Sequence, residues 1–155
     1  MTKLQKNALL ATAGSAALML GALAFQYIGG MPPCKMCIWQ RWPHVIAIVL
    51  GIIVFFLPKR IIALVSGLVV LVGAAIGVYH AGVEQKWWQG PTSCTGSGLS
   101  ASDNLLDFSA PVQLVLCDEI VWDLFGVTMA GWNALFSLVL VFIWLRAYAS
   151  NSASQ

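Results

Sequence analysis

The composition of this 155-residue chain is that of a membrane protein. Hydrophobic residues make up 59% before the 14 glycines are counted, whereas soluble proteins reach roughly 45 to 50% with glycine included. Only 9% of the residues are charged, so a folded core of this size could not be covered with polar groups. These values exclude a water-soluble globule, a disordered chain and a nucleic-acid-binding domain.

Four long stretches contain no Asp, Glu, Lys or Arg: residues 7–34, 42–58, 61–83 and 124–145. A helix needs about 17 to 25 predominantly apolar residues to cross a hydrocarbon core of roughly 30 Å. We therefore predict an all-α membrane protein, a four-transmembrane-helix bundle in which residues 1–155 form a single domain. The predicted spans are about 8–28, 41–57, 61–80 and 129–148, and the loops on one side of the membrane cover about 29–40 and 81–128.

The charged residues orient this bundle, because Lys and Arg near helix ends favour the cytoplasmic side. One side of a four-crossing topology holds five basic residues and no acidic ones: Lys3, Lys6, Lys59, Arg60 and Arg146. The other side holds all six acidic residues. We expect both termini to be cytoplasmic, and the short loop near 29–40 and the long loop at about 81–128 to face outward.

The first apolar stretch has an alternative interpretation. Lys3 and Lys6 precede an apolar run that ends in Ala22-Leu23-Ala24, as in a secretory signal with its cleavage site. The run continues through Ile28, however, which makes it longer than the usual 7 to 15 residues of such a signal. We therefore interpret it as a membrane helix.

All four cysteines fall in the two outer loops, with Cys34 and Cys37 in the short one and Cys94 and Cys117 in the long one. In an oxidising compartment, two such pairs suggest disulfides that can exchange, and Cys-x-x-Cys spacing favours a reactive thiolate. Two purely structural disulfides and a four-cysteine zinc site are the alternatives. We expect no metal, because such zinc sites usually carry two closely spaced pairs.

The first pair leads directly into the second predicted helix, through the segment Pro33-Cys34-Lys35-Met36-Cys37-Ile38-Trp39-Gln40-Arg41. A helix that begins near Cys37 would place this thiol at the positive end of the helix dipole. Arg41 would lie on the same face, one turn deeper. Both effects favour a thiolate, although Arg41 could instead be an interfacial arginine that reaches toward water.

The chain resembles the disulfide bond formation protein B family, the quinone-reducing membrane oxidases of bacteria. The resemblance covers nearly the whole chain and rests on five features: Cys34-x-x-Cys37-x-x-x-Arg41, Tyr79-His80, the pair Cys94 and Cys117, the run from Cys117 through Trp122-Asp123-x-Phe125-Gly126, and Met129 with Trp132. It implies a multi-pass protein of the bacterial inner membrane with periplasmic cysteine loops.

The resemblance also implies roles for individual residues. Cys94 would form the mixed disulfide with a periplasmic DsbA-like thioredoxin-fold protein, and Cys117 would then pair with Cys34. Cys37 would be freed as the thiolate that donates to a quinone, either ubiquinone or menaquinone. Arg41 and His80 would contact the quinone, while an interfacial histidine without a redox task is the alternative for His80. Gln40 receives no catalytic role, because its position is acidic in the best-known member.

Two further regions complete the prediction. An apolar quinone pocket with a few polar anchors could be supplied by Trp39, Trp42, His44, Tyr79 and His80. The apolar segment 105–116 suggests a patch lying on the membrane, with an ordinary loop packed on the bundle as the alternative. The function predicted is a thiol:quinone oxidoreductase that reoxidises its soluble partner, and the alternative is a disulfide-stapled scaffold subunit without redox turnover.

Overall fold

The computed structural model describes residues 1–94 and 116–150, and four long helices dominate them. These are α1 (Lys3–Tyr27), α2 (Lys35–Phe56), α3 (Arg60–Glu84) and α4 (Met129–Ala149). A small hairpin of β1 (Asp123–Leu124) and β2 (Val127–Thr128) precedes α4. All four helices are long and apolar enough to cross a membrane. The predicted all-α four-helix bundle is confirmed.

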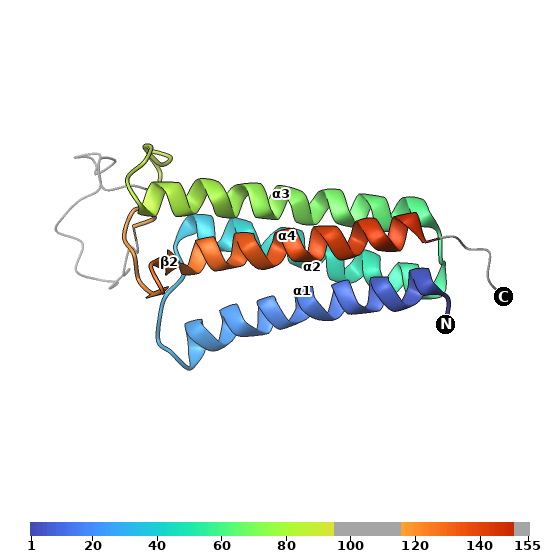
Figure 1. The fold of residues 1–155 in the computed structure, drawn as a ribbon. Helices are drawn as coiled ribbons and strands as arrows, with labels where there is room; N and C mark the ends of the chain where they lie inside the picture. Colours follow the sequence, from blue (N-terminus) through green and yellow to red (C-terminus); the bar gives the residue numbers. More distant parts are fainter. Residues whose placement is uncertain (95–115, 151–155) are drawn as a thin grey trace.

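The helices lie roughly side by side, so that the start of α1, the α2–α3 turn and the end of α4 share one end of the bundle (Figure 1). The α1–α2 connection and the hairpin lie at the opposite end. A capping box holds the first turn of α1, because Thr2 Oγ1 accepts from the Gln5 amide at 3.2 Å and the Gln5 side chain accepts from the Thr2 amide at 2.9 Å. The cysteines lie at the hairpin end of the bundle, away from the start of α1 and the end of α4.

Small residues let the helices approach closely. A Cβ atom at Gly77 would lie 3.0 Å from the Cβ of Ala134, so α3 packs against α4 with no room for a side chain there. At Gly73 the corresponding distance to Cβ of Pro43 is also 3.0 Å, which brings α3 against α2. Pro43 lies inside the helix assigned to α2. These contacts hold α2, α3 and α4 close together. The polar side chains that these helices carry near the hairpin end can therefore meet.

Helix α2 begins at Lys35, earlier than the predicted span at residue 41. Cys34 is its N-cap, with the Sγ atom accepting from the Cys37 amide at 3.2 Å. A side-chain acceptor at this position satisfies one of the amides that a helix start leaves unpaired. The Cys-x-x-Cys segment therefore forms the first helical turn itself rather than a loop before it.

Candidate active site

The two cysteines at the start of α2 are free thiols in contact. The Cys34 and Cys37 sulfurs are 3.0 Å apart, and the Cys34 thiol donates to Cys37. Cys34 is buried and Cys37 is half-buried. The hydrogen bond to Cys37, together with burial, raises the pKa of Cys34 above its ordinary value. Cys34 is therefore the partner that keeps the shared proton.

The second cysteine pair packs against the first. Cys94 and Cys117 form a disulfide with a Cα separation of 5.3 Å, and the Cys117 amide donates to the Cys94 carbonyl at 2.7 Å. Cys34, Cys94 and Cys117 form one buried cluster with Met36, and Cys37 packs against it. The structure thus brings all four predicted cysteines together, although the two pairs are far apart in the sequence.

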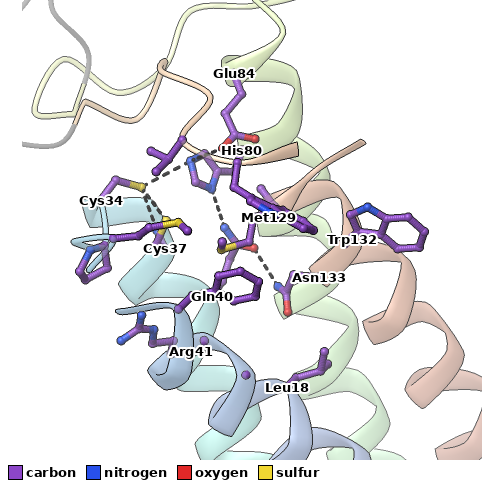
Figure 2. A pocket seen from close by; sticks show the side chains of 18 of the residues that line it. Leu18, Cys34, Cys37, Gln40, Arg41, His80, Glu84, Met129, Trp132 and Asn133 are labelled. Carbon is purple, nitrogen blue, oxygen red and sulfur yellow. Dashed lines mark hydrogen bonds and ion pairs between the residues drawn. The ribbon is translucent and has the colours of Figure 1, made fainter. Parts of the chain in front are cut away.

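A buried row of polar side chains runs from the thiols to α4 (Figure 2). His80 Nε2, on α3, lies 3.4 Å from the Cys34 sulfur, and His80 Nδ1 lies 2.7 Å from Gln40 Nε2 on α2. Gln40 Oε1 accepts from Asn133 Nδ2, on α4, at 2.8 Å. Three helices therefore hold this row, and it places His80 next to the Cys34–Cys37 pair.

A cavity of about 430 Å³ opens beside this row. Both thiols of the first pair line it, together with His80 and Arg41. The rest of the lining is mostly apolar and comes largely from α1, α4 and the segment before β1, including Leu18, Phe25, Trp122, Met129, Trp132 and Phe136. A volume of this size and an apolar wall with few polar groups are typical of sites for small organic molecules.

Comparisons with known proteins agree with this arrangement. The sequence model of the family described as "Disulfide bond formation protein DsbB" matches residues 5–147. The chain belongs to the DsbB family. Among similar proteins, the disulfide bond formation protein B of Marinobacter nauticus is 29% identical, over 90% of this chain and 91% of that protein.

Two other relatives carry the same kind of name. Disulfide bond formation protein B 2 of Pseudomonas aeruginosa is 31% identical, over 83% of this chain and 81% of that protein. The disulfide bond formation protein B of Shewanella sp. strain MR-4 is 32% identical, over 86% and 81%. No solved structure matches the chain significantly. Membership of the DsbB family makes the chain a multi-pass membrane oxidoreductase of disulfide bond formation.

Arg41 lines the cavity but is held by α1. Its Nη1 atom donates to Gln26 Oε1 at 2.6 Å, and the side chain is half-buried. The predicted position, one turn below Cys37 on α2, places the guanidinium at the cavity wall. This glutamine contact fixes the direction of Arg41 and could not be read from the spacing on α2.

The aromatic part of the predicted pocket was partly wrong. His44 and His80 line the cavity, whereas Trp39, Trp42 and Tyr79 do not. Trp39 and Trp42 are 41% and 61% exposed, because they occupy faces of α2 that point away from the other helices. Such positions suit the interfacial aromatic belt of a membrane protein. Most of the predicted patch at 105–116 lies outside the described residues.

Sequence reasoning missed three polar residues at the site: Gln40, Glu84 and Asn133. Gln40 is only 5% exposed, although it was assigned no role. Glu84 is 8% exposed and lies one turn after His80, with Oε1 3.7 Å from Nε2 of that ring. The spacing of His80 and Glu84 on one helix was a usable signal.

The same site has atoms that could hold a metal ion. The ligand atoms of Cys34, Cys37 and His80 all lie within 4.8 Å of one another. Two thiolates and an imidazole are ligands that zinc accepts. Two of these ligand atoms are the thiols of the first pair, so a bound ion would compete with any thiol exchange at them.

Proposed function

We propose that this protein is a protein-dithiol:quinone oxidoreductase. It would reoxidise a periplasmic DsbA-like thioredoxin-fold protein and pass the electrons to ubiquinone or menaquinone in the bacterial inner membrane. The observation that carries the proposal is the contact between the two cysteine pairs at the wall of an apolar cavity. Sulfur atoms in such contact can exchange bonds, and the cavity offers a place for a lipid-soluble electron acceptor.

Electrons would enter at the Cys94–Cys117 disulfide. A thiolate of the reduced partner attacks Cys94, the bond breaks, and the electron pair stays on Cys117. Cys117 then attacks Cys34 of an oxidised first pair and forms a Cys34–Cys117 bond, which leaves Cys37 as a thiolate. Packing of Cys34 and Cys117 in one buried cluster supports this transfer, because neither sulfur needs to cross solvent.

Cys37 would deliver the electrons to the cavity that it lines. A quinone takes up two electrons and two protons and becomes a quinol. Before that, the second thiol of the partner would attack the partner–Cys94 bond and release the oxidised partner, and the freed Cys94 would attack Cys117, restoring the Cys94–Cys117 disulfide and releasing Cys34 beside Cys37. Return of Cys34 and Cys37 to a disulfide then supplies the two electrons, so the net reaction converts one partner dithiol and one quinone into one disulfide and one quinol. Arg41 would hold a carbonyl oxygen, since its guanidinium provides N–H donors at the cavity wall, and the His80 ring would contact the quinone from the same wall.

The residues present fit a quinone head group. A flat ring with two carbonyl oxygens needs apolar walls and a few polar contacts, and the cavity offers Trp132, Phe136 and Met129 beside the Arg41 guanidinium. The side of the cavity near α1 includes Gly21, at which a Cβ atom would have no neighbour within 4 Å. There is therefore room for the ring along the first helix.

The basic residues support an orientation with both termini in the cytoplasm and the cysteines in the periplasm. Arg60, at the start of α3, donates to the Tyr148 carbonyl at 2.6 Å near the end of α4, so two of these basic helix ends lie together. The cysteine end would then meet the oxidising compartment in which the partner works.

Quinone reduction tests the proposal directly. Purified protein would receive a reduced DsbA-like protein and a short-chain ubiquinone, and the loss of quinone absorbance would be followed. The wild type should consume quinone in proportion to the partner dithiol, and Cys37→Ser should reduce the rate to background. Gln5→Leu, at the opposite end of the bundle, serves as the folding control. Equal rates for wild type and Cys37→Ser would contradict the proposal and leave the cysteines a structural role.

A further inference from the structure

The polar row at the site has a direction. Gln40 has one side-chain oxygen and one side-chain nitrogen, and the oxygen is already taken by the Asn133 donor at 2.8 Å. The nitrogen therefore faces His80 Nδ1 at 2.7 Å, and it also donates to the Met36 carbonyl at 3.4 Å. A nitrogen that donates requires an acceptor, so Nδ1 of His80 carries no proton.

The tautomer of His80 follows from this contact. A neutral imidazole without a proton on Nδ1 carries it on Nε2. Nε2 lies 3.4 Å from the Cys34 sulfur, so this N–H can donate to the first thiol, although His80 also has a hydrogen bond with the Cys117 backbone. Cys34 in turn donates to Cys37 across 3.0 Å.

Every hydrogen bond in the row consequently runs the same way, from Asn133 through Gln40, His80 and Cys34 to Cys37 (Figure 2). Donors in such a chain polarise one another, and the effect is strongest where water is excluded. Gln40, His80 and Cys34 are each at most 5% exposed. The chain ends on Cys37, which is half-buried and lines the cavity.

We propose that Gln40, anchored by Asn133, is a positioning residue that fixes the Nε2–H tautomer of His80 and so directs the hydrogen bonds toward the Cys37 thiolate. This inference deepens the proposed function and rests on it for the role of Cys37. It explains why an amide occupies this position. A carboxylate there could only accept, and would draw the His80 proton to Nδ1.

Other charged or titratable groups also face the cavity: Arg41 and His44 on α2, Glu84 on α3 and Glu119 in the segment before β1. Glu84 competes directly, because its Oε1 lies 3.7 Å from the same His80 Nε2. Arg41 donates to Gln26, outside the row. The His44 Nε2 lies 3.3 Å from Ser137 Oγ, and His44 also has a side-chain hydrogen bond with Asn133 of the row. Glu119 is exposed. Glu84 is therefore the group whose charge would alter the sharing of the His80 proton.

The first test observes the tautomer. The chain has only two histidines, so ring-nitrogen-labelled protein gives two ring systems in a nitrogen–proton correlation spectrum, and His44→Gln assigns them. The detergent-solubilised protein is kept reduced under nitrogen. We expect His80 with a bare Nδ1 and a protonated Nε2 in the wild type, and a protonated Nδ1 in Gln40→Glu. A protonated Nδ1 in the wild type would overturn the proposal.

The second test measures the thiolate. The rate of alkylation of reduced protein by iodoacetamide is followed against pH, and peptide mass mapping isolates the Cys37 product. Gln40→Leu should move the midpoint of this profile upward by about one pH unit, since it removes the donor that organises the row. Asn133→Leu should move it in the same direction by less, and Gln5→Leu, which removes an amide bonded to the Phe55 carbonyl at 2.9 Å, should not move it.

The outcomes separate this inference from the proposed function, because neither measurement uses quinone or partner. A shifted midpoint in Gln40→Leu with an unshifted Gln5→Leu supports the positioning role, even if the wild type fails to reduce quinone. An unchanged midpoint in both Gln40→Leu and Asn133→Leu overturns it, even if quinone turnover is normal. If Gln40→Leu does not fold, Asn133→Leu decides.

Discussion

The Glu84 Oε1 atom lies 3.7 Å from Nε2 of His80, one turn earlier on α3, and both side chains are buried. The other oxygen of Glu84 has no hydrogen-bond partner among the described residues. A buried carboxylate with an unsatisfied oxygen destabilises a fold, and one turn of helix keeps it beside the imidazole.

We expect Glu84→Gln to stabilise the protein. The neutral amide has a smaller desolvation cost than a carboxylate, so the free energy of unfolding should rise by about 1 kcal/mol. Thermal unfolding in detergent measures this change. The exposed Glu119→Gln should shift stability by less than about 0.5 kcal/mol. A lower unfolding midpoint for Glu84→Gln than for the wild type would show that the charge of Glu84 is stabilising.

Arg41 should govern quinone affinity more than turnover. Its guanidinium lines the cavity and is aimed by Gln26, at 2.6 Å. Arg41→Gln should raise the KM for a short-chain ubiquinone about tenfold, the value of one lost charged hydrogen bond, while kcat changes less. Gln26→Leu, which leaves the charge but frees its direction, should give a smaller increase. A fall in kcat at unchanged KM would instead place Arg41 in the electron-transfer step.

The order of thiol exchange predicts which cysteine meets the partner. In Cys117→Ala the free Cys94 thiol should attack the disulfide of an oxidised DsbA-like protein and remain bound to it, because no second thiol in its pair can resolve the bond. Non-reducing electrophoresis should show a one-to-one adduct that dithiothreitol releases. Cys94→Ala should give none, and an equal yield from both variants would reverse the assignment.

Close packing of α3 on α4 predicts a strong size limit at Gly77. A Cβ atom there would meet Ala134 at 3.0 Å, next to the Asn133 that anchors Gln40. Gly77→Val should lower the free energy of unfolding by about 1 to 3 kcal/mol through overpacking. Gly21→Val, where a Cβ atom has no neighbour within 4 Å, is the matched control for stability. Similar losses in both variants would attribute the effect to helix propensity alone.

The helices and the pair Cys34 and Cys37 could be predicted from the sequence, because both leave local signals. Apolar stretches of spanning length identified the bundle, and the spacing of Cys34 and Cys37 indicated the pair that the structure places at the cavity wall. The contact between Gln40 and Asn133 joins residues 93 positions apart. The spacing of apolar residues along the sequence does not show which polar side chains of different helices face each other. The contact between these two residues could therefore be found only in the structure.

The aromatic prediction was only partly right for a similar reason. Proximity in sequence suggested that Trp39 and Trp42 belong to the pocket, but successive helical residues point in different directions. Only residues on the inward face of α2, such as Gln40 and His44, reach the cavity. The rotation of a helix about its axis is set by packing with its neighbours, which composition does not specify.

The sulfur of Cys34 has two tasks in the proposed cycle, since the atom that would exchange bonds also accepts the Cys37 amide at the start of α2. When this sulfur turns toward another cysteine, that amide would lose its acceptor, and such losses typically cost about 1 kcal/mol. Each exchange at Cys34 would therefore leave the first turn of α2 less firmly capped until the sulfur returns.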